Sequence, residues 1–398
     1  MSSLPQNRPP VIAMLAGEAS GDNLGASLIQ GIHRLEPRAR CIGIGGPKMS
    51  EEGFESWYDM TELSVNGFVD PFLRLPHLIR VLIQTRNQVI AAKADCFVGI
   101  DFNFFNLLLA GLLKKKGIRT VHYVSPTVWA WRSGRVKKIA KKIDLMLTLY
   151  PFETEIYEKN NVRAKFVGHP RADEIDFDEG IKGRAAAREA FGFSETDRVI
   201  AMLPGSRKRE VQLSGPDFFH AAQQLVKANK KTKFIVPAAN KQRKKQIEEL
   251  VLAQNERLQV KVVHGKSQLA MQAADVVLAN SGTATLEAML LKKPMVMSYR
   301  LPPLTYALVS RLVTTEFFAL PNILSGRKLV EELIQDDATA HALASAVKRL
   351  VDRDQSSVIA VYDEIHRTLR QGAGTQAAKA VLELIQTNAP SGEANAST

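Results

Sequence analysis

The stretch VIAMLAGEASGDNLGASLIQGIHR, residues 11–34, decides the fold class. Its first residues are apolar without alternation, which predicts a strand buried on both faces, as in a parallel sheet. A turn containing Gly17 and Gly21 follows, and Leu24, Leu28 and Ile32 then recur at helical spacing. A strand, a short turn and a helix form the first half of a βαβ unit, so we expect a sheet covered by helices.

The same alternation continues along the chain. We expect further strands at 40–44, 96–100, 120–124, 145–149 and 165–167 and, after a break at Gly168-His169-Pro170, at 199–203, 233–236, 260–263, 276–278 and 294–298. The sequence therefore predicts an α/β protein with two doubly wound, Rossmann-like domains facing a central cleft. The expected segments are one domain at 1–172, a second at 173–345, helices that pack back toward the first domain or a partner at 346–387, and a disordered tail at 388–398.

Composition limits the compartment and the class of protein. The 398 residues are 45% hydrophobic and include two cysteines, Cys41 and Cys96, which favours a reducing compartment over a disulfide framework. The first ten residues lack the apolar core of a signal peptide, and the longest apolar stretch, 102–113, is shorter than the roughly 20 residues that span a bilayer. We expect a soluble or peripheral protein.

The positive charge is concentrated in one segment. The net charge is +12, and residues 114–142 contain ten Lys or Arg and no Asp or Glu. Such a segment can meet nucleic acid, an anionic membrane surface or only solvent. Zinc-finger spacing, aromatic RNA-binding signatures and heptads behind a basic region are all absent from the sequence, so we favour a membrane or a phosphorylated lipid over nucleic acid.

Two helix openings in the second half of the chain have residues that suit a diphosphate. In LPGSRKRE, residues 203–210, Gly205 and Ser206 allow close approach of a ligand to the backbone, Arg207 can hold phosphate oxygens with two hydrogen bonds, and Glu210 lies in the first helical turn. The alternative is an ordinary turn with a solvated basic cluster.

In NSGTATLE, residues 280–287, the opening is formed by Asn280, Ser281, Gly282 and Thr283, and Glu287 can accept from ribose hydroxyls. A capped helix start is the alternative. Two such openings in one domain favour a nucleotide.

The first half offers carboxylates at strand ends. The turn 17–22 is neither a Walker A loop nor a G-x-G-x-x-G motif, but Glu18 and Asp22 there suit acid–base chemistry or hydroxyl recognition, unless Asp22 only caps its helix. Asp101 ends the strand at 96–100 and can act as a general base; the alternative is a cap for the helix that follows.

Two segments are candidates for a lipid-facing or substrate-facing surface. We expect the first to be no long helix, because Pro71 and Pro76 interrupt it; plain core is the alternative. Its apolar residues are Phe68, Val69, Phe72, Leu73 and Leu75, and the second segment contributes Trp129, Trp131 and Arg132. The pair Asp176 and Asp178 imitates a metal-binding D-x-D motif but lies in an acidic linker, where a solvated turn is the simpler interpretation. The sequence has no other cluster with metal-ligand spacing, so we expect neither a metal nor another cofactor.

Six motifs in this order resemble the lipid-A-disaccharide synthase family. They are AGEASGDNLG from Ala16, YVSPTVWAWR from Tyr123, FVGHP from Phe166, LPGSRKREV from Leu203, NSGTATLEAML from Asn280 and FFALPNILSGR from Phe317. The resemblance implies the GT-B fold, with an acceptor and membrane-facing first domain and a UDP-sugar-binding second domain. It also implies an inverting, metal-independent transfer from UDP-2,3-diacylglucosamine to 2,3-diacylglucosamine 1-phosphate through a β-1′,6 bond. The expected location is the cytoplasmic face of the inner membrane, as a peripheral protein and possible homodimer.

By motif, the resemblance assigns UDP to Arg207, Ser281, Gly282, Thr283, Glu287 and Asn322, and makes Asp101 an essential acid, with Glu18 as the second candidate base. Ser20 and Asp22 are expected at the acceptor. The chain departs from the family pattern at 102–104, where Phe-Asn-Phe follows Asp101, and at Asp70, where Glu is usual. Two alternatives stay open: another GT-B enzyme that uses UDP-N-acetylglucosamine, as a transferase or an epimerase, and a basic membrane- or nucleic-acid-binding protein without activity.

Overall fold

The computed structural model describes residues 8–60, 71–127, 134–254, 258–280, 282–311, 313 and 315–387. They fall into two compact units, one formed by residues up to Asp173 together with those from Leu369 onward, the other by Glu174–Thr368. The expected boundary at 172/173 thus differs by one residue from the observed one. The expected terminal segment 346–387 is divided between the units at Leu369, and the expected tail at 388–398 lies outside the described residues.

The first unit contains a seven-stranded parallel sheet in the order β3-β2-β1-β4-β5-β6-β7. The strands are β1 Val11–Ala16, β2 Arg40–Gly45, β3 Glu55–Asp59, β4 Cys96–Ile100, β5 Arg119–Tyr123, β6 Leu145–Thr148 and β7 Ala164–Phe166. Strand order reverses between β1 and β4, where Ala16 pairs with Ile100. The segments that leave these two strands, 17–22 and 101–103, therefore emerge together at a switch point, where doubly wound sheets bind ligands.

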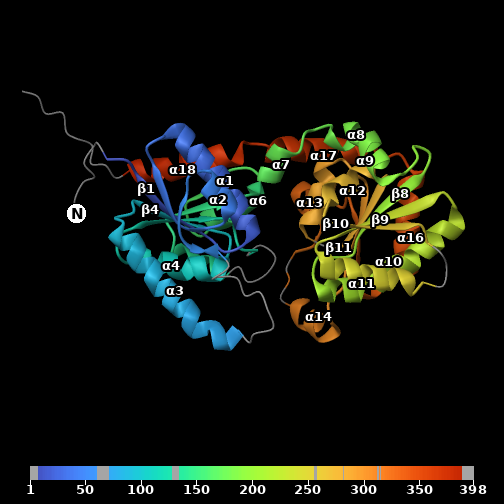
Figure 1. The fold of residues 1–398 in the computed structure, drawn as a ribbon, viewed down its shortest axis with the longest axis horizontal. Helices are drawn as coiled ribbons and strands as arrows, with labels where there is room; N and C mark the ends of the chain where they lie inside the picture. Colours follow the sequence, from blue (N-terminus) through green and yellow to red (C-terminus); the bar gives the residue numbers. More distant parts are fainter. Residues whose placement is uncertain are drawn as a thin grey trace, which may run out of the picture. The chain divides into compact units, whose positions relative to one another are not determined.

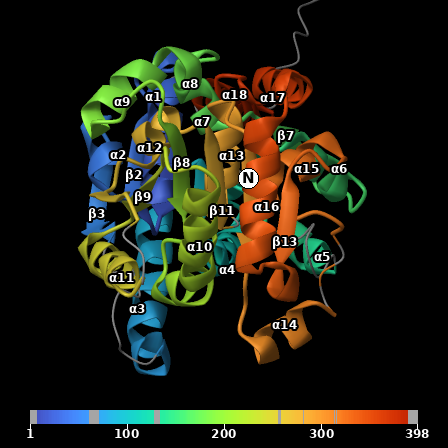
Figure 2. The same ribbon diagram turned by 90° about the vertical axis from the view of Figure 1, so that its right-hand side faces the viewer.

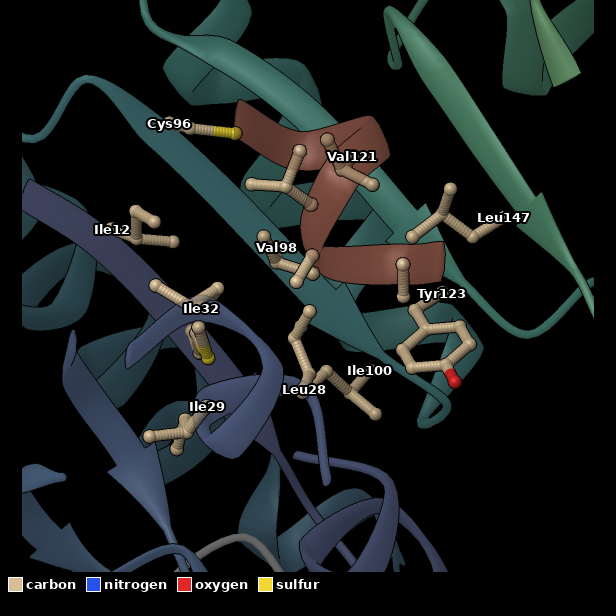
Figure 3. Close-up of a cluster of buried hydrophobic side chains, with 14 of the residues drawn as sticks. Ile12, Leu28, Ile29, Ile32, Cys96, Val98, Ile100, Val121, Tyr123 and Leu147 are labelled. Carbon is tan, nitrogen blue, oxygen red and sulfur yellow. The ribbon is translucent and has the colours of Figure 1, made fainter. Parts of the chain in front are cut away.

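Helices cover both faces of this sheet. They are α1 Ala19–Leu35, α2 Pro47–Glu51, α3 Pro71–Ala91, α4 Asn103–Lys114, α5 Arg135–Ala140, α6 Pro151–Glu158, α7 Pro170–Glu174 and α18 Ala373–Gln386. Figure 1 shows α1 and α18 on one side of the sheet and α3 and α4 on the other. Side chains of α1, among them Leu28 and Ile32, pack on Ile12, Val98 and Ile100 of the sheet (Figure 3).

Helix α3 corrects an expectation from the sequence. It runs without interruption over 21 residues, with Pro76 inside it. Pro71 is the first residue of the helix, where the missing N–H has no intrahelical partner to lose. Pro76 removes one hydrogen bond near the helix start, while Val81 and Val89 further along are buried against the sheet. Packing of the later turns therefore outweighs the single lost bond.

The second unit repeats the architecture with six parallel strands in the order β10-β9-β8-β11-β12-β13. They are β8 Arg198–Leu203, β9 Thr232–Ala238, β10 Val260–His264, β11 Val276–Asn280, β12 Met295–Tyr299 and β13 Glu331–Ile334. Its helices are α8 Glu179–Lys182, α9 Arg184–Phe191, α10 Lys208–Ala228, α11 Lys241–Leu252, α12 Ser267–Ala273, α13 Thr283–Leu290, α14 Pro303–Val309, α15 Leu320–Ser325, α16 Ala340–Asp352 and α17 Ser356–Leu369. Helices α10 and α16 lie side by side over one face of this sheet (Figure 2). Its switch point lies between β8 and β11, whose carboxyl ends lead into the openings of α10 and α13.

Among the described residues, no helix combines the length and the apolar character needed to cross a bilayer.

Candidate functional site

A pocket of about 570 Å³ opens at the carboxyl ends of the central strands in the second unit. It is lined by Leu203, Gly205, Ser206, Arg207, Glu210, Pro237, Ala238, Ala239, Gly265, Ser267, Asn280, Gly282, Thr283, Ala284 and Glu287. Both helix openings predicted from the sequence thus line one pocket. The pocket also contains residues at or just after the ends of β9 and β10, which the sequence did not predict although their place at neighbouring strand ends could have indicated them: Pro237–Ala239, Gly265 and Ser267.

Glu210 shapes the opening of α10. Its Oε2 accepts hydrogen bonds from the backbone N–H groups of Ser206, at 2.9 Å, and Arg207, at 3.1 Å. These two N–H groups, which precede the first helical residue Lys208, are therefore occupied by a carboxylate of the same helical turn and are not free for a diphosphate. Gly205 has a φ of +128°, and a Cβ built on it would collide with Glu210. Gly205, Ser206 and Glu210 together hold the turn.

Arg207 remains available to a ligand. Its side chain is 85% exposed, and its guanidinium has one long contact to a described residue, Glu210, at 3.5 Å. A guanidinium offers a fork of donors to phosphate oxygens. Nearby, burial and the charge of Glu210 raise the pKa of Tyr299, the last residue of β12, so this phenol stays protonated.

The opening of α13 differs from that of α10 because open space surrounds its first residues, Gly282 and Thr283. Gly282 has a φ of +126° and no atom within 4 Å of the position of a Cβ. Thr283 beside it is exposed, and Glu287, one turn further, also lines the pocket. Ser281 lies outside the described residues.

Asn280 is the unusual residue of the pocket. It ends β11 and is 3% exposed, yet within the part of the chain that the structure describes neither its amide nitrogen nor its amide oxygen has a hydrogen-bond partner. A buried polar group left unpaired costs about 1–3 kcal/mol. Because the side chain lines the pocket, its donor and acceptor are positioned for a ligand that brings both partners.

Asn322 has a different environment from the one implied by the family. It is fully buried, its Nδ2 donates to the carbonyl of Val330 and to Glu332, and its Oδ1 accepts from the N–H groups of Leu329 and Val330. Its amide therefore holds the segment that follows α15, and Asn322 is not among the residues that line the pocket.

In the first unit, the structure brings together two residues from separate motifs. Ser20 Oγ donates to Asp101 Oδ2 at 3.1 Å, across the ends of β1 and β4. Asp101 is partly exposed and Ser20 is exposed, so a hydroxyl of a ligand can reach this carboxylate. Glu18 is exposed at the start of α1 and makes no side-chain cap there.

Asp22 is neither at an open surface nor a cap of its own helix, which corrects both interpretations offered for it. It lies inside α1 and is 3% exposed. Its carboxylate accepts from the N–H groups of Gly46, Lys48 and Met49 at 3.0–3.1 Å. Asp22 thus caps the start of α2, and both of its oxygens are occupied.

The predicted lipid-facing residues are described only in part. Phe68, Val69, Trp129, Trp131 and Arg132 lie outside the described residues, and Phe72, Leu73 and Leu75 belong to α3 without described side chains. Further along α3 and on α4, large apolar side chains are exposed: Ile79 48%, Ile83 43%, Phe104 80% and Leu108 37%. Two pockets of about 660 and 380 Å³ lie beside them, lined by Leu82, Leu107, Leu108, Leu112, Lys115, Lys138, Lys141 and Lys142, among others.

No His, Cys, Asp and Glu side chains gather into a possible metal site within the described ranges. Of the D-x-D pair, Asp178 precedes α8 and pairs with Lys182 at 2.6 Å, and this contact lowers its carboxyl pKa. The pair belongs to a surface turn, as its sequence context indicates.

Comparison with known proteins adds relatives over almost the whole chain. A family model described as lipid-A-disaccharide synthetase matches residues 12–385. Proteins named lipid-A-disaccharide synthase from Sodalis glossinidius and Azotobacter vinelandii are 45% and 46% identical, covering 95% and 94% of this chain and 99% and 98% of their own lengths.

Solved structures share the fold at low identity. A UDP-GlcNAc 2-epimerase from Neisseria meningitidis bound to UDP-GlcNAc superposes with a TM-score of 0.60 at 12% identity, covering 96% of this chain and all of that one. An α,α-trehalose 6-phosphate synthase from Burkholderia multivorans gives 0.57 at 12% identity, covering 96% and 98%. The predicted GT-B architecture is confirmed by these neighbours.

Proposed function

Because this chain belongs to the lipid-A-disaccharide synthase family, we propose that it joins two acylated glucosamines into the lipid A disaccharide. It is a glycosyltransferase of lipid A biosynthesis. The donor is UDP-2,3-diacylglucosamine, the acceptor is 2,3-diacylglucosamine 1-phosphate, and the products are the β-1′,6-linked disaccharide 1-phosphate and UDP.

The pocket of the second unit is the proposed UDP site. The unpartnered amide of Asn280 carries this assignment, since it supplies one donor and one acceptor inside a pocket framed by two helix openings. Arg207 would neutralise the diphosphate, Thr283 would donate to it, and Glu287 would accept from ribose hydroxyls. Gly205, Ser206, Glu210 and Gly282 would shape the pocket, and Asn322 would hold the neighbouring loop.

Asp101 is the proposed general base. It would take the proton of the acceptor's 6-hydroxyl as that oxygen attacks the anomeric carbon of the donor. The carbon–oxygen bond to UDP breaks on the opposite face, which inverts the configuration. The leaving diphosphate takes the bonding electrons, and Arg207 stabilises this charge, so the mechanism requires neither a metal nor another cofactor. Ser20 would orient the carboxylate through its 3.1 Å hydrogen bond, and Glu18 is the second candidate base.

The first unit is the proposed membrane-facing part, on the cytoplasmic face of the inner membrane. Exposed apolar side chains of α3 and α4, among them Ile83 and Phe104, lie beside pockets edged by Lys115, Lys138 and Lys141. Apolar groups that enter the headgroup region next to cations suit an anionic lipid surface. A homodimer is also proposed, and light scattering of the purified chain tests it.

Incubation with both diacyl substrates, followed by mass spectrometry, tests the reaction. We expect the disaccharide monophosphate and UDP in equal amounts. Equal turnover of unacylated UDP-N-acetylglucosamine would instead favour another GT-B transferase, and formation of a C2 epimer without acceptor would favour an epimerase.

A further inference from the structure

The turn that carries Asp101 has an uncommon backbone. Asp101 and Phe102 have φ values of 50° and 42°, so two consecutive residues with side chains occupy the left-handed region. Residues other than glycine rarely adopt this conformation, and it persists only where the surroundings hold it. Its effect is to end β4 abruptly and to turn the carboxylate of Asp101 toward Ser20.

One buried amide holds this turn. Asn106, in the first turns of α4, is fully buried, and its Nδ2 lies 2.9 Å from the carbonyl oxygen of Asp101 and 3.2 Å from those of Leu15 and Ile100. Its backbone N–H also donates to the carbonyl of Phe102 at 3.2 Å. A single side chain thus links the ends of β1 and β4 to the residue that carries the carboxylate.

The space around this amide is restricted. A Cβ on Gly99 would come within 2.7 Å of Asn106, and a Cβ on Gly17 would come within 2.5 Å of the ring of Phe102. The absence of a side chain at Gly99 leaves room for Asn106, and its absence at Gly17 leaves room for the ring of Phe102. The amide of Asn brings two N–H donors to these carbonyls. The carboxylate of Asp has the same size but would place an oxygen against the carbonyl oxygens, where it has no hydrogen to donate.

We propose that Asn106 is a positioning residue that sets the orientation of the Asp101 carboxylate, an inference that rests on the proposed role of Asp101 as the base. Asn106 does not touch substrate in this account. It acts through the backbone of Asp101, so its loss displaces the base while the nucleotide pocket of the second unit stays intact.

A double-mutant cycle tests this role. We expect Asn106→Ala to lower kcat about 100-fold, since a displacement of roughly 1 Å has that effect on a reacting group, and to leave the Kd for UDP within about two-fold. In an Asp101→Ala background, the same substitution should lower the residual rate by less than about three-fold, because the base it positions is already gone. Asn160→Ala is the control for loss of a single amide-to-carbonyl hydrogen bond away from this turn, since the partly buried Asn160 donates to the carbonyl of Ile156, and it should leave kcat unchanged.

The pH dependence of Asn106→Asp gives a second readout that a purely structural role would not produce. A buried carboxyl facing carbonyls can donate only when it is protonated. The kcat of this variant, relative to the unmodified chain, should therefore rise about ten-fold from pH 8 to pH 6. This readout decides the matter if Asn106→Ala does not fold.

Three outcomes overturn the proposal: an Asn106→Ala kcat within three-fold of the unmodified chain, an undiminished effect in the Asp101→Ala background, or an Asn106→Asp ratio that is flat with pH. If Asp101→Ala itself leaves kcat within a few-fold, the proposed base is wrong, and the role of Asn106 falls with it. A large Asp101→Ala effect beside an unchanged Asn106→Ala rate overturns only the role of Asn106.

Discussion

Asn280 offers a substitution that should stabilise the fold while it damages the site. In Asn280→Leu, a buried amide with two unpartnered atoms is replaced by an apolar side chain of similar size. Removing the unpaired groups should raise the free energy of unfolding of the ligand-free protein by about 1–3 kcal/mol. For a unit of roughly 200 residues, this corresponds to an increase in Tm of about 2–4 °C per kcal/mol.

The same substitution removes a donor and an acceptor from the proposed UDP site. A hydrogen bond to a charged group contributes about 1.5–3 kcal/mol, so the Kd for UDP should rise about 10- to 150-fold. Calorimetric titration with UDP and thermal unfolding without ligand measure the two effects on one protein preparation.

Asn322→Leu is the matched control. Asn322 is as buried as Asn280, but all of its polar atoms have partners, and the substitution leaves the N–H groups of Leu329 and Val330 without their acceptor. It should lower the free energy of unfolding by about 2–5 kcal/mol. If Asn280→Leu instead lowers the Tm as Asn322→Leu does, and UDP binds unchanged, Asn280 is an ordinary buried amide and its assignment to the ligand is refuted.

Three further predictions concern the base, pH and the membrane. Asp101→Ala should lower kcat by about 10²- to 10⁴-fold with UDP affinity unchanged in calorimetry, and a rate within a few-fold of the unmodified chain would transfer the role to Glu18. Burial lowers the pKa of His122 to about 3 and that of His169, which also lies near Arg171, to about 4. In the unfolded chain both imidazoles take up a proton near pH 6.5, whereas in the folded protein they stay neutral down to about pH 4. The free energy of unfolding should therefore be highest above about pH 7 and fall as the pH drops from there toward 4, by up to about 1.4 kcal/mol per pH unit for each histidine. Urea unfolding from pH 5 to 7.5 should show this slope, and His169→Gln should reduce it. Replacing Lys115 and Lys141 by Glu should weaken binding to phosphatidylglycerol vesicles, and so should 1 M salt. Binding that does not change with salt would refute the electrostatic contribution and leave only apolar contacts to hold the protein on the membrane.

The sequence predicted the strands well where both faces are buried. Runs such as Val11–Leu15 and Cys96–Ile100 have no polar residue, and the structure has β1 and β4 there. The strands that the sequence analysis missed are β3 and β13, at the edges of their sheets, with sequences ESWYD and EELI. These two short edge strands contain charged residues among partly exposed side chains, so their composition does not distinguish them from loops, whereas the other edge strands, β7 and β10, were predicted.

The sequence predicted where in the fold the candidate site lies, but not the side-chain contacts within it. The two helix openings and the carboxylate after β4 follow from strand ends, because residues at the carboxyl ends of neighbouring parallel strands converge. Asn106 lay inside a stretch read as an apolar helix, and nothing in its spacing indicates that its amide reaches back to Leu15, 91 residues earlier. Such a contact depends on sheet order, which local sequence does not encode.

Several motif residues that imitate ligand-binding groups serve the fold, and the reason is the same in each case. A sharp turn between a strand and a helix leaves N–H groups unpaired, and a nearby carboxylate is the strongest local acceptor for them. Glu210 caps the start of α10 in this way, and Asp22 caps α2 from within α1. Among the described residues of the second unit, those that stay available to a ligand include the exposed guanidinium of Arg207, the open space at Gly282 and the unpartnered amide of Asn280. The proposed donor site therefore depends on fewer residues than its motifs contain. Substitutions at the capping residues Glu210 and Asp22 should lower the free energy of unfolding more than they weaken UDP binding.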